Sequence, residues 1–148
     1  MQVLVISVGR LKDKELKALI QDYGKRISRF TRFDEKEIKD AQLDTVREQI
    51  ERAIPKRSRT IALEVQGKSF TSPQFAAAVE HARHDAIEHL VFIIGGAYGL
   101  PKTISDQADL KLSLSTMTLP HRLARLLLLE QIYRAFSILA NEPYAHES

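Results

Sequence analysis

The chain has 148 residues, 44% of them hydrophobic, which is enough for one core but hardly for two. It contains no cysteine, which excludes disulfides, a thiolate nucleophile and cysteine-based metal sites. No apolar run approaches the roughly 20 residues of a membrane span, and the first residues lack the basic region of a signal peptide. We therefore expect a single domain over residues 1–148, located in the cytoplasm.

The net charge of +3 is unevenly distributed along the chain. Residues 1–60 hold 15 Lys and Arg against 10 Asp and Glu, whereas residues 61–148 hold 7 against 9. A basic half is typical of proteins that bind a polyanion, nucleic acid above all. A solvated basic surface explains this composition equally well.

Strands and helices alternate in the predicted secondary structure. Three apolar runs are typical of strands buried on both faces, as in a parallel sheet: Val3–Val8, Thr60–Val65 and Leu90–Ile94. A charged segment at residues 33–38 is a weaker strand that suits an edge, and residues 111–115 form the last strand. Helices are expected at residues 13–30, 42–54, 72–84, 101–108 and 121–140. This order predicts an α/β domain with a mostly parallel sheet.

Three of the predicted strands, at residues 60–65, 90–94 and 111–115, end in loops that suit a ligand. These loops are Gln66-Gly67-Lys68, the glycine loop Gly95–Gly99, and Thr116-Met117-Thr118. In a parallel sheet, ligands bind beyond the carboxyl ends of the strands, and glycine allows the backbone to approach them closely. The glycine loop matches neither the dinucleotide fingerprint nor a Walker loop, so a plain strand–helix turn is its alternative interpretation.

The last predicted helix carries four consecutive leucines, Leu126–Leu129. They cover more than one helical turn, so this turn has no polar side. One face can pack on the sheet, and a second copy of the chain is the simplest cover for the opposite face. Glu130 and Arg134 are four residues apart, and they either pair or leave Arg134 to contact a phosphate or base.

Two further groups of polar residues are candidates for chemistry. One has helical spacing that can bind zinc: His81, His84, Asp85, Glu88 and His89. A solvated helix end is the favoured interpretation of this group, and no metal is expected. The other group is Tyr144 and His146 in the C-terminal tail. Such a tail is commonly frayed, although an aromatic residue is unusual in a disordered segment.

Six motifs are spread along the chain. They are VISVGRLK at residues 5–12, LEVQGKSFTS at residues 63–72, IIGGxxGL at residues 93–100, LSLSxMTLPH at residues 112–121, LLLLEQIYRAFSI at residues 126–138 and NxPY at residues 141–144. Together they closely resemble the RlmH family, SPOUT-class methyltransferases that act on pseudouridine in the RNA of the large ribosomal subunit. The block over residues 112–136 is specific to that family.

The resemblance implies a SPOUT α/β-knot fold, in which a mostly parallel sheet is flanked by helices and the C-terminal half forms a trefoil knot. It also implies a homodimer, with S-adenosylmethionine bound in the knot and no metal. The residues here that match the family's cofactor positions are Leu63, Gly95, Leu114, Ser115, Thr116, Met117, Thr118 and Leu119.

The implied reaction is methyl transfer to N3 of a pseudouridine in 23S rRNA of the ribosome. It requires loss of the N3 proton and donors for the charge that builds on the neighbouring carbonyl oxygens. Arg134, Tyr144 and His146 are the candidate catalytic residues, and His121 is a weaker one. The chain departs from the family at Ala145, where a histidine is expected. A non-catalytic dimeric RNA-binding protein of the same fold is the alternative function.

Overall fold

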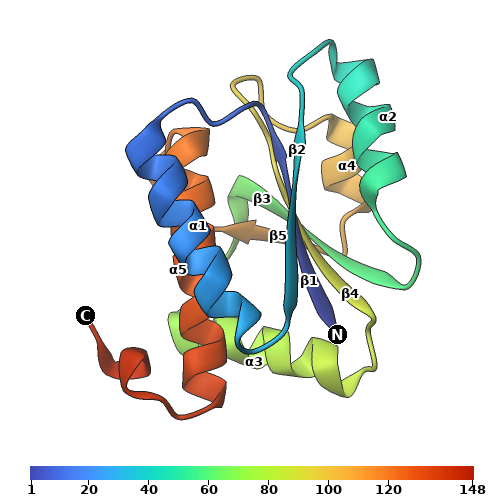
Figure 1. Cartoon of the computed structure of the whole chain (residues 1–148). Helices are drawn as coiled ribbons and strands as arrows, with labels where there is room; N and C mark the ends of the chain where they lie inside the picture. Colours follow the sequence, from blue (N-terminus) through green and yellow to red (C-terminus); the bar gives the residue numbers. More distant parts are fainter.

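Five parallel strands form the sheet of the protein, whose computed structural model describes residues 1–148 (Figure 1). The strands are β1 (Gln2–Val8), β2 (Arg32–Ile38), β3 (Ser58–Ser69), β4 (His89–Ile94) and β5 (Leu110–Ser113). Their order across the sheet is β2-β1-β4-β3-β5. The predicted parallel α/β sheet is confirmed, and the charged strand β2 lies at an edge as expected.

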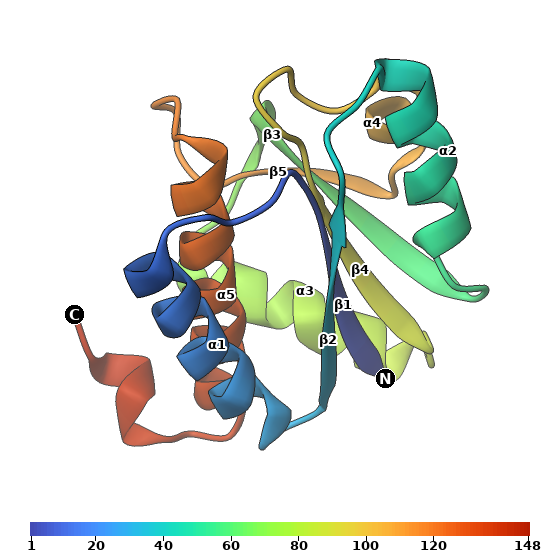
Figure 2. The ribbon, with the colours of Figure 1, turned by 45° about the horizontal axis from the view of Figure 1, so that its top comes forward.

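Helices cover both faces of the sheet. They are α1 (Lys14–Ser28), α2 (Leu43–Ala53), α3 (Ser72–His84), α4 (Lys102–Gln107) and α5 (His121–Leu139), followed by the 3-10 helix η1 (Pro143–His146). α1, α3 and α5 pack on one face, and α2 and α4 pack on the other (Figures 1 and 2). All five helices lie within two residues of their predicted bounds. None of them is long and apolar enough to cross a membrane.

The strand β1 alternates its side chains between the two faces, as the period of two in a strand requires. Val3 and Val5 join the larger apolar cluster, which is shared with α1, α3 and α5. Ile6 and Val8 join the smaller cluster, which is shared with α2 and α4. Burial on both faces explains why the strand is an uninterrupted apolar run in the sequence.

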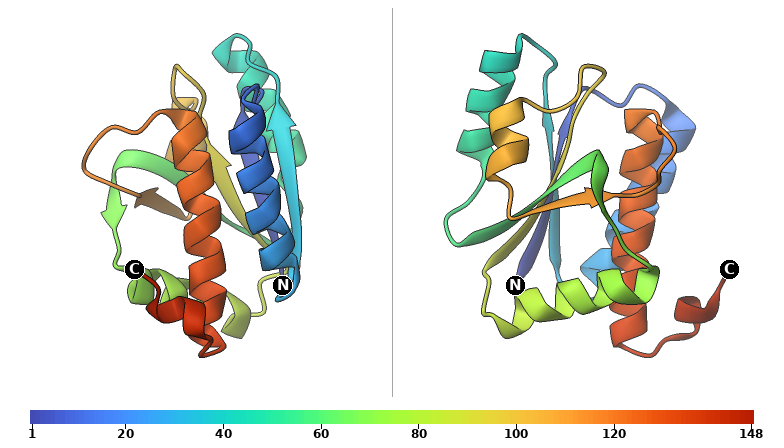
Figure 3. Two further views of the ribbon diagram at one scale, coloured as in Figure 1. Left: turned by 60° about the vertical axis from the view of Figure 1, so that its left-hand side comes forward. Right: turned by 180° about the vertical axis from the view of Figure 1, so that it is seen from behind.

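The strand β3 is longer than the sequence predicts. A loop is expected at Gln66-Gly67-Lys68, but β3 continues through Ser69, so that expectation is wrong. The pairing of β3 with β5 shifts register between Leu63 and Lys68, where a bulge is inserted. A Cβ at Gly67 would lie only 2.7 Å from the carbonyl carbon of Lys111, so only glycine lets β3 cross β5 this closely (Figure 3). Glycine inside a strand often marks such a bulge.

The four leucines of α5 divide between the core and the surface. Leu128 and Leu129 have no exposed surface and belong to the larger apolar cluster. Leu126 is half-buried, whereas Leu127 keeps 43% of its surface exposed. The protein's own core therefore covers one side of this turn, and Leu127 marks the side that is left uncovered.

Arg125 connects the start of α5 to the edge strand β2. Its side chain is 10% exposed and pairs with Glu35 at 3.1 Å and with Glu37 at 2.7 Å. Burial raises the pKa of Glu35, and Arg125 only partly offsets this. Burial also acts to raise the pKa of Glu37, but hydrogen bonds from Arg125 and the Leu11 amide prevail and lower it. The helical pattern of the sequence does not identify this buried arginine.

Replacing Arg125 by methionine should lower the free energy of unfolding by about 3 kcal/mol, because two partly buried carboxylates lose their counter-charge. Chemical denaturation at neutral pH measures this change. Arg52→Met removes an exposed arginine of α2 and is the control, with an expected change below about 0.5 kcal/mol. Equal losses in both variants would contradict the anchoring role of Arg125.

The loss of unfolding free energy caused by Arg125→Met should also depend on pH. The pKa of Glu37 is depressed in the folded protein, so its pairing with Arg125 stabilises the fold above the pKa of the unfolded chain, about 4.3. That contribution is lost as pH falls through the lower pKa of the folded state. The difference in unfolding free energy between Arg125→Met and the wild type should therefore become smaller below about pH 4.

Candidate functional site

A pocket opens beside the middle of β3, at the carboxyl ends of β4 and β5. Its volume is about 540 Å³, within the range of roughly 300–1,000 Å³ that is usual for small-molecule sites. Its lining comes from three stretches of chain, residues 63–65 in the bulge of β3, residues 94–100 after β4, and residues 112–124 between β5 and α5. Figure 3 shows the last of these as the long loop above β5. The position is the one at which parallel sheets bind ligands.

Seven of the eight residues at the expected cofactor positions lie together in this pocket. They are Leu63, Gly95, Leu114, Ser115, Met117, Thr118 and Leu119. Thr116 is the exception, because it is exposed and does not line the cavity. His121, in the first turn of α5, does line it. Val65 and Ala124 also belong to the wall and were not predicted. Val65 lies in the motif over residues 63–72, whereas Ala124 is outside the motifs and is brought to the pocket only by the fold.

The segment Ser115–Leu119 keeps its backbone groups available. None of its amides donates to another backbone group, and the Met117 amide instead bonds the hydroxyl of Ser115 at 3.0 Å. The hydroxyl of Ser113 donates to the carbonyl of Ser115 at 2.9 Å and so fixes the start of the loop. Free N–H and C=O groups beside an apolar wall suit a ligand with a flat apolar face and a polar edge.

Close backbone contacts hold the glycine loop in a compact shape. A Cβ at Gly95 would lie 2.6 Å from the carbonyl carbon of Gly99, so any side chain there would displace the loop. The Gly99 amide donates to the carbonyl of Gly96 at 3.0 Å, and these two residues form an isolated antiparallel bridge. The loop therefore presents backbone, rather than side chains, to the pocket.

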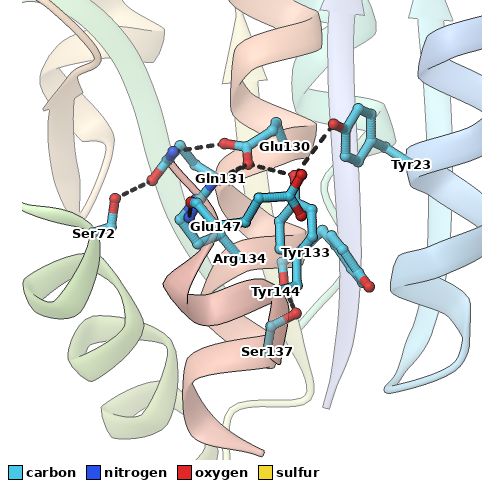
Figure 4. A network of polar contacts seen from close by, with 9 residues as sticks. All are labelled: Tyr23, Ser72, Glu130, Gln131, Tyr133, Arg134, Ser137, Tyr144 and Glu147. Atoms are coloured by element: carbon cyan, nitrogen blue, oxygen red, sulfur yellow. Dashed lines mark hydrogen bonds and ion pairs between the residues drawn. The ribbon is translucent and has the colours of Figure 1, made fainter. Parts of the chain in front are cut away.

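Two of the candidate catalytic side chains, Arg134 and Tyr144, lie elsewhere, around Glu130 of α5 (Figure 4). The Glu130 carboxylate accepts hydrogen bonds from Arg134, at 3.1 Å from Nε and 2.9 Å from Nη2. It also accepts from the hydroxyl of Tyr144 at 2.8 Å and from the side-chain amide of Gln131 at 2.7 Å. Gln131 in turn accepts from the hydroxyl of Ser72 at 2.7 Å. Of the two alternatives for Arg134, pairing with Glu130 is the one observed.

The tail is folded onto α5 rather than frayed. The ring of Tyr144 lies 4.5 Å from the ring of Tyr133, measured between centroids, and the Arg134 guanidinium lies 5.0 Å above it. The hydroxyl of Tyr23 on α1 is 3.2 Å from that of Tyr144. Arg134 also donates to the backbone carbonyl of Glu147. These contacts give the aromatic residue of the tail its packing partners.

The contacts set the charge states of the network. Burial raises the pKa of Tyr144, and its hydrogen bonds with Tyr23 and Glu130 raise it further. Tyr144 is therefore a neutral phenol at neutral pH and serves as a hydrogen-bond donor, not as a proton acceptor. Burial acts to lower the pKa of Arg134, but its hydrogen bond to Glu130 prevails and raises it. Arg134 therefore keeps its positive charge.

His146 lies on η1, is exposed, and lines a second cavity of about 550 Å³ together with Arg134. This tail cavity is far from the first pocket in the same chain. Arg134 follows His121 by 13 residues on one helix, which corresponds to about 20 Å along its axis. The structure thus groups Arg134, Tyr144 and His146 with one another but not with the expected cofactor residues.

A groove of about 240 Å³ joins the two cavities along α5. It shares Leu114 with the first pocket and Gln131 with the tail cavity. Leu127 lines it, and Leu123, one turn earlier, is 41% exposed. This side of α5 is therefore an apolar stripe that runs between two hollow regions.

Three of the candidate zinc residues have partners of their own. Glu88 pairs with Arg57 at 2.8 Å. His84 bonds the carboxylate of Glu80 at 2.9 Å. Asp85 pairs with Arg59 on β3 at 2.8 Å. No group of three or more His, Asp or Glu side chains is placed to hold a metal ion.

Comparison with known proteins reveals similarity along nearly the entire chain. A family model described as "Predicted SPOUT methyltransferase" matches residues 1–146. The ribosomal RNA large subunit methyltransferase H of Sorangium cellulosum (strain So ce56) is 47% identical, over 99% of this chain and 100% of that protein. The protein of the same name from Clostridium botulinum (strain Langeland / NCTC 10281 / Type F) is 41% identical, over 97% and 99%.

A solved structure supports the fold independently. A probable methylase family protein from Haemophilus influenzae Rd KW20 superposes with a TM-score of 0.52. The match covers 95% of this chain and 67% of that one, at 11% sequence identity. At this identity, the similarity concerns the arrangement of the elements alone.

Proposed function

The chain belongs to the SPOUT methyltransferase family, and from this membership we propose that it methylates 23S rRNA of the ribosome with S-adenosylmethionine as the methyl donor. The proposed target is N3 of a pseudouridine, and residues 1–148 would act as one methyltransferase domain. The observation that carries the proposal is the pocket beside the middle of β3 and the carboxyl ends of β4 and β5, in a chain that is 47% identical to a ribosomal RNA methyltransferase.

The first pocket fits S-adenosylmethionine in size and in the chemistry of its walls. The side chains of Leu63, Leu114 and Leu119 can enclose a purine ring. The free backbone groups of residues 115–119 can hydrogen-bond the polar edge of that ring. When bound, the cofactor supplies an electrophilic methyl group on a positively charged sulfur. The bare backbone at Gly95 lets the ligand approach the end of β4 closely.

Three side chains of the tail are proposed to act on the target base. N3 must lose its proton, and His146 offers an exposed imidazole to accept it. Negative charge then builds on the carbonyl oxygens beside N3, and Arg134 is the cation proposed to stabilise it. Tyr144 stays protonated, and its proposed role is to hold Glu130 and Arg134 in place.

These groups can meet the methyl donor only if a second copy of the chain supplies them. Within one chain, Arg134 lies about 20 Å along α5 from the pocket. The exposed Leu123 and Leu127 flank the groove that leads from the pocket to the tail. In a two-fold dimer through this face, the tail of one copy faces the pocket of the other. We therefore propose a homodimer with two composite active sites.

Methyl transfer to ribosomes that lack the modification tests the proposed reaction. The purified protein is incubated with labelled S-adenosylmethionine, and the label is mapped in the 23S rRNA. We expect label at one pseudouridine. Label at a different nucleotide would overturn the proposed target, and no label would favour the alternative of a non-catalytic RNA-binding protein.

Arg134→Ala should reduce the rate of methyl transfer by at least about 100-fold, because it removes the cation proposed to stabilise developing charge. Its affinity for S-adenosylhomocysteine, measured by calorimetry, should stay within about twofold of the wild type, since Arg134 does not line the cofactor pocket. Arg134→Lys keeps the charge and should recover part of the rate. Arg52→Ala is the control, and full activity of Arg134→Ala would refute the assigned role.

Leu127→Asp should convert the dimer into a monomer and abolish methyl transfer, because a carboxylate would be buried in the proposed interface. Light scattering during size-exclusion chromatography measures the oligomeric state. Leu43→Asp is the matched control, since Leu43 on α2 is 50% exposed and Leu127 is 43% exposed. The control should stay dimeric and active. A fully active Leu127→Asp monomer would exclude a composite site.

A further inference from the structure

A small recess lies beside the cofactor pocket, between the ends of β1 and β4. Ser7 lies on its inner side, and Arg10, His121 and Arg122 are exposed at its rim. It shares Gly95 and His121 with the cofactor pocket. We call this recess the β1–β4 notch. Its volume is about 10 Å³, which is room for about one water-sized oxygen.

The notch lies where the topology favours a ligand. β1 and β4 are neighbours in the sheet, but β1 leads to α1 on one face and β4 leads to α4 on the other (Figure 2). The crevice between two such strands is a typical ligand site in parallel sheets. Gly9, with φ of +98°, turns the chain out of β1, and a Cβ there would lie 3.8 Å from Nε2 of His121. The loop after β1 therefore lies close to the first turn of α5.

The hydroxyl of Ser7 is buried in the notch without a hydrogen-bond partner. The residue is only 4% exposed. Buried hydroxyl groups are nearly always hydrogen-bonded in folded proteins, because an unpaired one is costly. An oxygen atom that enters the notch from outside would satisfy this hydroxyl.

The rim of the notch carries two arginines that form no ion pair. Arg10 and Arg122 are exposed and form no ion pair, whereas Arg125 behind them is paired with two carboxylates of β2. Asp13 lies within electrostatic range of Arg122, but its carboxylate accepts the Leu16 amide at the start of α1. The rim therefore suits an anion.

The start of α5 adds hydrogen-bond donors at the same place. Its N-cap residue, Pro120, has no side-chain oxygen to bond the first amides of the helix. The amides of His121 and Arg122 donate to no backbone group. Free amides at a helix N-terminus carry partial positive charge and favour an anionic ligand.

We propose that the β1–β4 notch binds a phosphate group of the RNA backbone next to the target nucleotide. One phosphate oxygen accepts a hydrogen bond from the hydroxyl of Ser7. The other oxygens accept hydrogen bonds from the guanidinium groups of Arg10 and Arg122. This inference rests on the proposed methylation of RNA, because the notch adjoins the pocket assigned to the methyl donor. The exposed rim suits a polymer, which can approach along the surface, better than the carboxylate of an enclosed small molecule.

The test compares two double variants of equal net charge. Arg10→Ala with Arg122→Ala removes the rim. Arg32→Ala with Lys56→Ala removes two exposed cations at the amino ends of β2 and β3, whereas the notch lies at the carboxyl ends of its strands. Initial rates are measured with unmodified ribosomes at several salt concentrations. The rim variant should raise KM for ribosomes about tenfold. It should also reduce the slope of log KM against log salt concentration by about one unit, because one phosphate contact is lost. The control should change KM less than about twofold.

Two further measurements make the assignment specific. Ser7→Ala, which changes no charge, should raise KM about threefold, because one hydrogen bond to the phosphate is lost. An unchanged KM in Ser7→Ala would contradict phosphate binding in the notch. It would instead indicate that a diffuse basic surface binds the RNA. The rim variant should retain its affinity for S-adenosylhomocysteine, and a loss of that affinity would reassign the notch to the cofactor. A rise of KM in the control equal to that of the rim variant would also overturn the proposal.

Equilibrium binding to the same ribosomes separates this inference from the proposed reaction. If the wild-type protein binds ribosomes but transfers no methyl group, the proposed reaction fails. Weaker binding of the rim variant than of the control would then still support the phosphate site. Equal binding of the two variants would contradict it.

Discussion

The position of α5 is the constraint on which the rest of the structure depends. This helix begins at the loop that lines the cofactor pocket and ends at the tail, and its 19 residues span about 28 Å. Leu128, Leu129 and Ile132 are fully buried and fix the helix on the sheet. The two ends of α5 therefore cannot approach each other within one chain. If the methyl donor binds at one end and the catalytic groups lie at the other, two copies of the chain must form each active site together.

Partly buried ion pairs fix the two ends of α5. Near the first end, Arg125 is paired with two carboxylates of β2, and this contact holds the first turns of the helix between the cofactor pocket and the β1–β4 notch. Further along, Glu130 collects hydrogen bonds from Arg134 and Tyr144 and so holds the tail. Such pairs offset their desolvation only when each charge is well bonded. Arg125 achieves this for Glu37, whose pKa is lowered, but only in part for Glu35, whose pKa is raised. The few polar residues of this leucine-rich helix thus have positional roles.

The sequence predicts a strand or helix well wherever its buried side chains follow a simple pattern along the chain. β1 and β4 are buried on both faces and are visible as apolar runs, and the charges of β2 mark it as an edge. The loops after β4 and β5 could be placed in one site because parallel strands end at the same edge of the sheet. The continuation of β3 past Gly67 could not be predicted, since it depends on how closely Lys111 passes. The burial of Arg125 likewise depends on a distant strand, and the threading of a trefoil knot stays a prediction.

In the proposed reaction, the tail determines which group can accept the proton of the target base. The raised pKa of Tyr144 leaves its phenol protonated, and Arg134 keeps its charge beside Glu130, so neither can serve as a base near neutral pH. His146 is the remaining candidate of the three. A 3-10 helix has about three residues per turn, so moving the histidine from position 145 to position 146 rotates its side chain by about 120°. Ala145 and His146 nevertheless line the same cavity as Arg134, so the imidazole stays within the tail site despite the shift.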